Sequence, residues 1–156
     1  MFKYYLVLLL SIFLLFACSK KNNEKILSQN QTDEEIAIAL YAEAIEALNK
    51  GDAFFAGKKF KETESLMPQS EWAAKASLMA TYADYTRNAY SSAVFGLERH
   101  IKNYPADKNI PYAHYLIAIC YYEQILDEKK DLQPLLRAKE KFEFIMQTYP
   151  DTDYAT

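Results

Sequence analysis

The chain has 156 residues, of which 51% are hydrophobic, and this is enough apolar material for the core of about one domain. Only three glycines are present, so a β-sandwich with many tight turns is disfavoured and a helical fold is favoured. The formal net charge of −3 leaves no basic field that could attract a nucleic acid, and we exclude nucleic acids as partners.

The N-terminus has the pattern of a secretory signal. Its apolar run covers residues 4–17, which is shorter than the roughly 20 residues that span a bilayer. The letters LLFAC at residues 14–18 resemble the bacterial lipoprotein signal, which implies that residues 1–17 are removed and that Cys18 carries a covalent lipid. Several acyl chains on one cysteine hold a protein stably at a membrane. In such lipoproteins a residue like Ser19 favours the outer membrane. The alternative is an ordinary signal, or a membrane anchor with a chance cysteine.

Residues 18–32 comprise the lipidated cysteine and a polar tether that lacks hydrophobic periodicity. The first helix is predicted to begin after Thr32, because Thr32 and Glu35 have the spacing of a capping box. Apolar residues then recur at helical spacing over 36–48. Gly51 is predicted to end this helix in the left-handed conformation.

Three prolines mark an internal repeat. Pro68, Pro105 and Pro150 each end a helical pattern, with an alanine twelve residues earlier and a large apolar residue eight residues earlier. These pairs are Ala56 and Phe60, Ala93 and Leu97, and Ala138 and Phe142. Each unit is therefore predicted to be two antiparallel helices that end at a proline. Since one helix pair cannot bury its own apolar face, the units are expected to stack.

The predicted fold is all-α, a solenoid of antiparallel helix pairs with about three repeats at 33–69, 70–107 and 108–150. The third repeat contains a charged insertion at 127–134, and residues 151–156 begin a fourth. An array that stops there would expose the apolar face of its last helix pair. We therefore expect the sequence to be an N-terminal fragment or an incomplete gene product.

The units resemble tetratricopeptide repeats, for which GDAFFAGKKF at 51–60 carries the Gly-Asp, Ala and Phe of the pattern. The order of the segments along the chain narrows this resemblance to one group of repeat proteins. The chain contains, in this order, the lipoprotein signal, the tether and the segments LYAEAIEALNKGD, PQSEWAAKASLMATYADY, YSSAVFGLERHIKNYP, NIPYAHYLIAICYYEQI and YPDTDYA. This ordered set is similar to the BamD-type outer membrane lipoproteins of the β-barrel assembly machinery. The resemblance covers nearly all of residues 15–156.

The resemblance implies a scaffold without enzymatic activity, anchored by lipid to the periplasmic face of the outer membrane, that helps to fold and insert outer membrane proteins. The implied partners are the β-barrel assembly subunit, other lipoproteins of the complex, unfolded outer membrane protein clients and the membrane itself. Because the family docks the assembly subunit mainly through later repeats, this chain alone is expected to dock poorly.

Two alternatives stay open. One is a tetratricopeptide lipoprotein that serves as an adaptor for cell-envelope constriction or peptidoglycan machinery. The other is an accessory domain of a peptidoglycan enzyme whose catalytic part lies beyond Thr156.

The sequence shows no catalytic constellation. His100, His114 and Cys120 do not have the spacing of metal ligands, so we predict no catalytic site, no metal and no cofactor apart from the covalent lipid on Cys18. Cys120 lies in the apolar run LIAICYY and is predicted to be a buried, inert thiol.

Tyrosines are the candidate binding residues, because they offer contact area, rigidity and a hydroxyl group. In tetratricopeptide arrays the first helix of each pair lines the concave surface, and this implies a groove formed by Tyr41, Ile45, Leu78, Tyr82 and Tyr85. The alternative, that Tyr82 and Tyr85 are part of the core between repeats, stays open. Two further aromatic residues, Trp72 and Tyr112, are predicted to pack at the turns between units.

Overall fold

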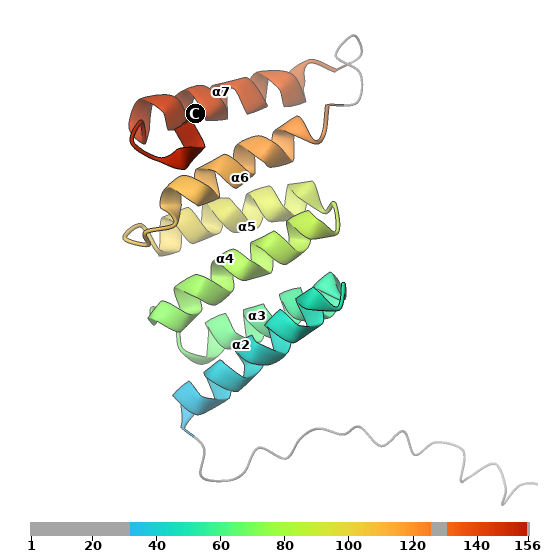
Figure 1. Cartoon of the computed structure of the whole chain (residues 1–156), viewed down its shortest axis with the longest axis vertical. Coiled ribbons are helices and arrows are strands. Elements are labelled where there is room, and N and C mark those ends of the chain that lie inside the picture. The colour runs from blue at the N-terminus through green and yellow to red at the C-terminus, as the bar shows by residue number, and fades with distance from the viewer. Residues whose placement is uncertain (1–31, 126–130, 156) are drawn as a thin grey trace, which may run out of the picture.

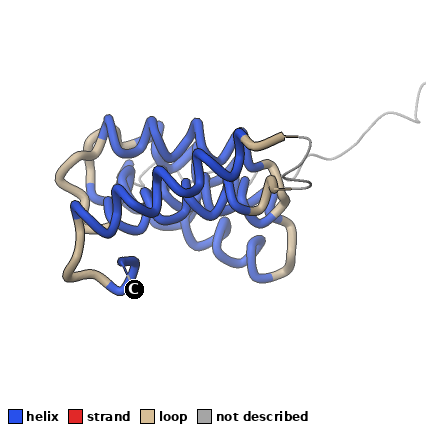
Figure 2. Tube along the Cα trace, turned by 90° about the horizontal axis from the view of Figure 1, so that it is seen from above, coloured by secondary structure: helices blue, strands red, loops and turns tan. Residues whose placement is uncertain are grey.

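The computed structural model describes residues 32–125 and 131–155. All regular structure in these residues is helical, as the sequence predicts, and the connecting segments are short (Figure 2). The elements in chain order are α2 (Asp33–Asn49), α3 (Ala53–Leu66), α4 (Glu71–Thr86), α5 (Tyr90–Asn103), α6 (Ile110–Tyr122), α7 (Gln133–Thr148) and the 3₁₀ helix η2 (Asp153–Ala155).

Each α-helix packs against the helix that follows it in the chain, from α2 through α7. The pairs α2–α3, α4–α5 and α6–α7 form a stack that runs from one end of the molecule to the other (Figure 1). This arrangement is a solenoid of helix pairs, which confirms the predicted fold class.

Local signals set the helix ends. Thr32 and Glu35 form the predicted capping box, in which the Glu35 amide donates to Thr32 Oγ1 at 3.2 Å and the Thr32 amide donates to Glu35 Oε2 at 2.9 Å. The side chains of Asp52 and Ser70 cap α3 and α4 by accepting from the Phe55 and Ala73 amides, without the reciprocal bond of a capping box. Gly51 has a φ of +83°, so the turn after α2 uses the left-handed conformation that glycine adopts without strain.

The repeated alanines occupy equivalent buried positions on the second helix of each pair. Ala56 and Ala93 are fully buried and Ala138 is 2% exposed, which lets neighbouring helices approach closely. Of the large residues one turn later, Phe60 and Leu97 are fully buried, whereas Phe142 on α7 is only half-buried.

Two apolar clusters form the core. One joins α2, α3 and α4, and its buried members are Ala44, Ala47, Ala56, Phe60, Ala76 and Ala80. The other joins α4, α5 and α6, and its buried members are Leu78, Ala93, Val94, Leu97, Ala113, Leu116, Ile117 and Cys120. Because α4 contributes to both clusters, it links the first repeat to the rest of the stack.

A polar contact also joins the first two repeats. Glu64 on α3 is 8% exposed and accepts a hydrogen bond from Arg99 Nη2 at 2.7 Å and another from the Tyr104 hydroxyl at 3.2 Å. The carboxylate therefore has two donors from the second repeat, which compensates for its burial.

The third repeat begins its second helix earlier than the sequence suggested. Gln133 and Pro134, which we assigned to the charged insertion at 127–134, lie in the first turn of α7. Proline is tolerated there because the first amides of a helix have no intrahelical acceptor. Residues 126–130 lie outside the described part of the chain.

Candidate functional site

The five residues predicted for the groove lie on α2 and α4, which are the first helices of their pairs. Leu78 is 7% exposed and belongs to the core cluster of α4, α5 and α6, so it offers almost no surface to a ligand. Tyr82 and Tyr85 are half-buried and pack against this cluster. Each of the two rings therefore covers the core with one part and keeps another part in solvent.

Tyr41 and Ile45 lie in the neighbouring cluster. The Tyr41 ring is 5.2 Å from the Phe60 ring and 5.5 Å from the Trp72 ring, measured between centroids, and Ile45 packs against the same buried residues. Burial raises the pKa of the Tyr41 hydroxyl. The structure thus brings Leu78, Tyr82 and Tyr85 together and places Tyr41 and Ile45 in a separate group.

Three tyrosines beyond those predicted for the groove extend the surface around Tyr82 and Tyr85. Tyr154 on η2 lies with its ring 5.7 Å from the Tyr112 ring and 5.4 Å from the Tyr115 ring, both on α6. Burial, together with the nearby Tyr82, Tyr154 and Tyr85 hydroxyls, raises the pKa of Tyr112 to about 12. We call Tyr82, Tyr85, Tyr112, Tyr115 and Tyr154 the tyrosine face.

The repeat spacing partly indicates this extension of the surface. The aromatic residues at 72, 112 and 154 follow the repeat spacing, and from it we predicted packing at the turns for Trp72 and Tyr112. Both make ring contacts, Trp72 with Tyr41 in the middle of α2 and Tyr112 with Tyr154 on η2. Their proximity to Tyr82 and Tyr85 depends on how the repeats stack, which spacing along the chain does not give.

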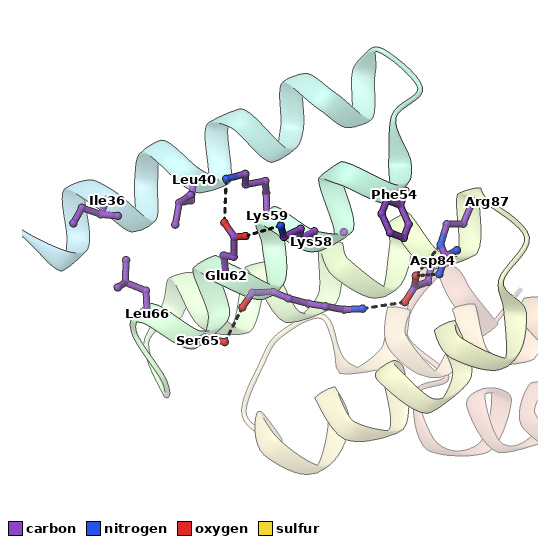
Figure 3. Close-up of a pocket in the computed structure, with 12 residues that line it drawn as sticks. Ile36, Leu40, Phe54, Lys58, Lys59, Glu62, Ser65, Leu66, Asp84 and Arg87 are labelled. Carbon is purple, nitrogen blue, oxygen red and sulfur yellow. Dashed lines mark hydrogen bonds and ion pairs between the residues drawn. The ribbon is translucent and has the colours of Figure 1, made fainter. Parts of the chain in front are cut away.

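A second surface was not predicted. A cavity of about 840 Å³ lies over α3, with Ile36 and Leu40 of α2 at one end and the C-terminal turn of α4 at the other (Figure 3). Lys61 on α3 also lines the cavity and pairs with Asp84 on α4, with Nζ and Oδ2 3.6 Å apart. Arg87 holds the same carboxylate, with Nη2 2.8 Å from Oδ1.

The histidines and the cysteine take structural positions. Cys120 is fully buried, as predicted, and burial raises the pKa of its thiol to about 12. His100 is fully buried, and the His114 ring lies 4.8 Å from the Phe144 ring and 5.8 Å from the Tyr149 ring. Within residues 32–125 and 131–155, no group of three His, Cys, Asp or Glu side chains is arranged to hold a metal ion.

The predicted membrane attachment concerns a different part of the chain. None of the described helices is long and apolar enough to cross a bilayer. The predicted lipidation residue, Cys18, lies outside the described residues, and the lipid anchor therefore stays a prediction.

Curated proteins with related sequences share one description. Over 139 residues the chain is 35% identical to "Outer membrane protein assembly factor BamD" of Caulobacter vibrioides, covering 89% of this chain and 45% of that protein. It is 32% identical over 137 residues to the protein of the same name from Rickettsia prowazekii, covering 88% of this chain and 52% of the relative. The corresponding protein of Xylella fastidiosa strain Temecula1 is 27% identical over 161 residues, covering 97% of this chain and 54% of the relative.

The chain thus spans about half the length of the curated relatives that it matches. A family model described as "YfiO: Outer membrane lipoprotein" matches residues 33–156, which include every described helix. The sequence resemblance to BamD-type lipoproteins is confirmed by these matches, and the chain belongs to the YfiO family of outer membrane lipoproteins.

Proposed function

We propose that this chain acts as a lipid-anchored scaffold in the assembly of outer membrane proteins. Its membership of the YfiO family carries this proposal, because the relatives it matches are named as outer membrane protein assembly factors. The anchor would be the covalent lipid on Cys18, with the helical stack on the periplasmic side. The role is one of binding and positioning, without catalysis and without a cofactor other than this lipid.

The tyrosine face is the proposed client surface. Half-buried tyrosines are held in place by the core and keep part of each side chain in solvent, so an extended peptide could bind without much ordering of the surface. A transmembrane β-strand alternates apolar and polar side chains, and its apolar residues would contact the rings. Tyr41 and Ile45 would extend this surface toward the first helix, and Leu78 would support the rings from beneath.

Client binding can be measured with the full-length gene product and a fluorescent peptide of about ten residues whose side chains alternate as in a barrel strand. Tyr82→Ala combined with Tyr85→Ala should weaken binding by about tenfold, the loss expected from two aromatic contacts of moderate strength. Tyr122→Ala is the matched control, because this tyrosine is 58% exposed on α6 and does not belong to the tyrosine face. Unchanged peptide affinity with unchanged helicity in the double variant would refute the assigned surface.

Partner identity needs a separate experiment. The full-length gene product, captured from solubilised outer membranes, should recover a large β-barrel subunit with periplasmic domains together with other lipoproteins. Recovery of constriction or cell-wall proteins in place of that subunit would contradict the proposed role and leave the fold and the family unaffected.

A further inference from the structure

Two adjoining cavities form one groove between α3 and α5, with α4 beneath it. The cavity of about 840 Å³ over α3 and a second of about 500 Å³ over α5 share three lining residues, which are Lys61, Asp84 and Arg87. Phe54 lines the first cavity, and Phe95 and Arg99 line the second. We call this surface the α3–α5 groove, defined by Phe54, Lys61, Asp84, Arg87, Phe95 and Arg99.

Small residues keep the groove open. Gly57 on α3 and Gly96 on α5 line its two walls, and Ala80 and Thr81 on α4 lie between them. A Cβ atom on Gly57 would lie 3.5 Å from the Ala83 Cβ, so α3 approaches α4 closely at this position. The groove is therefore deep because the residues in its walls and floor have small side chains or none.

The α3–α5 groove and the tyrosine face lie on opposite sides of α4. Successive helical residues are about 100° apart around the axis, so Asp84 lies about 200° from Tyr82. Arg87 lies on the Asp84 side and Leu78 on the Tyr82 side, whereas Thr81 and Tyr85 are four residues apart and are neighbours between the two sides. A ligand in the groove would therefore leave Tyr82 free.

The groove contains lysine side chains that are only weakly paired with carboxylates of the chain. Asp84 is held by Arg87 through two contacts, Nε at 3.0 Å and Nη2 at 2.8 Å, so its charge stays compensated when Lys61 moves away. Lys61 lies 3.6 Å from Asp84 and its side chain is 58% exposed. An incoming carboxylate could recruit Lys61 without leaving a buried charge unpaired.

Lys58, which also lines the cavity over α3, is the second available cation. Its Nζ is 3.9 Å from Glu62 Oε1, at the limit of an ion pair, and its side chain is 68% exposed. Glu62 already accepts a hydrogen bond from Lys59 at 3.0 Å, and Lys59 also lies 3.5 Å from Glu43. Lys58 can therefore turn toward a ligand while Glu62 keeps its main partner.

The start of α5 adds to the positive potential of the groove. Ser91 and Ser92 of its first turn line the cavity over α5. The N-cap residue, Ala89, makes no side-chain hydrogen bond, and the first turn contains no acidic residue. The partial positive charge of these amides is thus left uncompensated by any side chain of the helix itself.

Two exposed aromatic rings border the groove. Phe54 is 73% exposed and Phe95 is 72% exposed, values that no other described large hydrophobic side chain reaches. The guanidinium carbon of Arg87 lies 5.8 Å from the Phe54 ring centroid, which orients that ring at the edge of the groove. Exposed apolar rings beside cations favour a ligand that carries both acidic and apolar groups.

From these features we infer that the α3–α5 groove binds an extended acidic segment of a partner protein, with a carboxylate at Lys58 and Lys61 and an apolar side chain between Phe54 and Phe95. The concave shape of the groove fits an extended polypeptide segment better than a flat membrane surface. This inference goes beyond the proposed client binding, because it assigns a second ligand to the opposite side of α4.

The test uses the full-length gene product and a fluorescent peptide of about ten residues that has acidic residues on both sides of a central phenylalanine. We expect binding that weakens as sodium chloride rises from about 0.05 M to about 0.5 M, because these contacts are screened by salt. A peptide with the acids replaced by their amides should bind at least tenfold more weakly. Equal binding of the two peptides would overturn the inference.

Variants locate the binding site. Lys58→Gln with Lys61→Gln should weaken binding of the acidic peptide about tenfold, and so should Phe95→Ser. The matched control is Lys50→Gln with Lys139→Gln, since these exposed lysines each pair with a glutamate four residues away, as Lys58 does. Equal losses in the control and the groove variant would overturn the assignment. The inference would also be overturned if the acidic peptide does not bind and anionic phospholipid vesicles do bind, in a way that depends on Lys58 and Lys61.

Discussion

Gly96 on α5 lies so close to Thr81 on α4 that a Cβ atom at this glycine would stand 2.5 Å from Thr81 Cγ2. Thr81 is 3% exposed, and its hydroxyl donates a hydrogen bond of 2.6 Å to the Leu78 carbonyl oxygen. Its methyl group therefore has little freedom to move away. This contact fixes how closely the two helices of the second repeat can pack.

Gly96→Ala should lower the free energy of unfolding by up to about 2 kcal/mol, because overpacking strain of about 1–3 kcal/mol outweighs the gain in helix propensity of about 1 kcal/mol. Gly57→Ala is the matched control. Its added Cβ meets Ala83 Cβ at 3.5 Å, an ordinary contact, so stability should rise by about 0.5–1 kcal/mol. Urea unfolding followed by circular dichroism gives both values.

Thr81→Ser removes the methyl group that Gly96→Ala would meet and keeps the hydroxyl. The double variant should therefore recover most of the stability that Gly96→Ala loses. If the two changes are additive, the loss does not come from the contact between these positions.

The capping box at Thr32 should act locally. Thr32→Ala removes the side-chain acceptor for the Glu35 amide, at a cost of about 1 kcal/mol to the helix end. Because α2 packs mainly on α3, we expect faster hydrogen exchange in the first turn of α2 and little change in global unfolding.

Ser70→Ala is the matched comparison, since Ser70 caps α4 through the Ala73 amide at 3.0 Å. The helix α4 contacts both α3 and α5, so the loss of its cap should appear in the global free energy of unfolding. Equal effects of the two substitutions on global unfolding would show that α2 does not open separately.

Much of the fold follows from short patterns in the sequence. The spacing of Pro68, Pro105 and Pro150 gives the helix pairs, and the alanines twelve residues earlier give the buried contact positions. Long-range polar contacts do not follow in this way. Glu64 and Arg99 are 35 positions apart, and the sequence offers each of them several nearer partners.

The two candidate surfaces differ in how far the sequence predicts them. Tyr82 and Tyr85 follow the helical period and the repeat, so their helix face could be predicted, although the contact of Tyr154 with α6 could not. The α3–α5 groove takes its residues from three helices. Lys58 and Lys61 belong to a stretch with the ordinary pattern of a solvated helix, and only the packing of the repeats places Lys61 opposite Asp84.

Cys120 should be protected from thiol reagents in the folded chain. A thiol with a pKa of about 12 in place of 9.0 contains about a thousandfold less thiolate at neutral pH, and full burial also blocks access. Labelling with an aromatic disulfide should be slow in the Cys18→Ser protein and fast after unfolding. A suitable control combines Cys18→Ser, Cys120→Ala and Tyr122→Cys, because Tyr122 is 58% exposed on the same helix. Similar labelling rates at the two positions would contradict the burial of Cys120.

His100 should make the stability of the chain depend on pH near neutrality. The ring is fully buried, and neither of its nitrogens has a hydrogen-bond partner among the described residues. Burial lowers the pKa of His100 below its ordinary value of 6.5, and Arg99 lowers it further. The Asp107 carboxylate, 3.7 Å from Nε2, and the Glu64 carboxylate oppose this change without cancelling it.

The direction of the pH effect follows from these shifts. Below about pH 6.5 the unfolded chain takes up a proton on this histidine that the folded chain does not yet accept, so the free energy of unfolding falls as the pH falls. The loss continues until the pH reaches the lower pKa of the folded state. His114, whose pKa is also lowered by burial and by Lys141, should contribute in the same direction.

His100→Leu removes the titrating group and replaces an unpaired polar ring by an apolar side chain, so it should reduce the loss of stability between about pH 7.5 and about pH 5. His114→Leu should reduce it separately, and the double variant should reduce it most. Urea unfolding at the two pH values measures each difference. If the His100→Leu variant loses as much stability as the unmodified chain between the two pH values, the buried ring is not the source of the pH dependence. Protonation of the carboxylates around the ring would then have to account for the loss of stability.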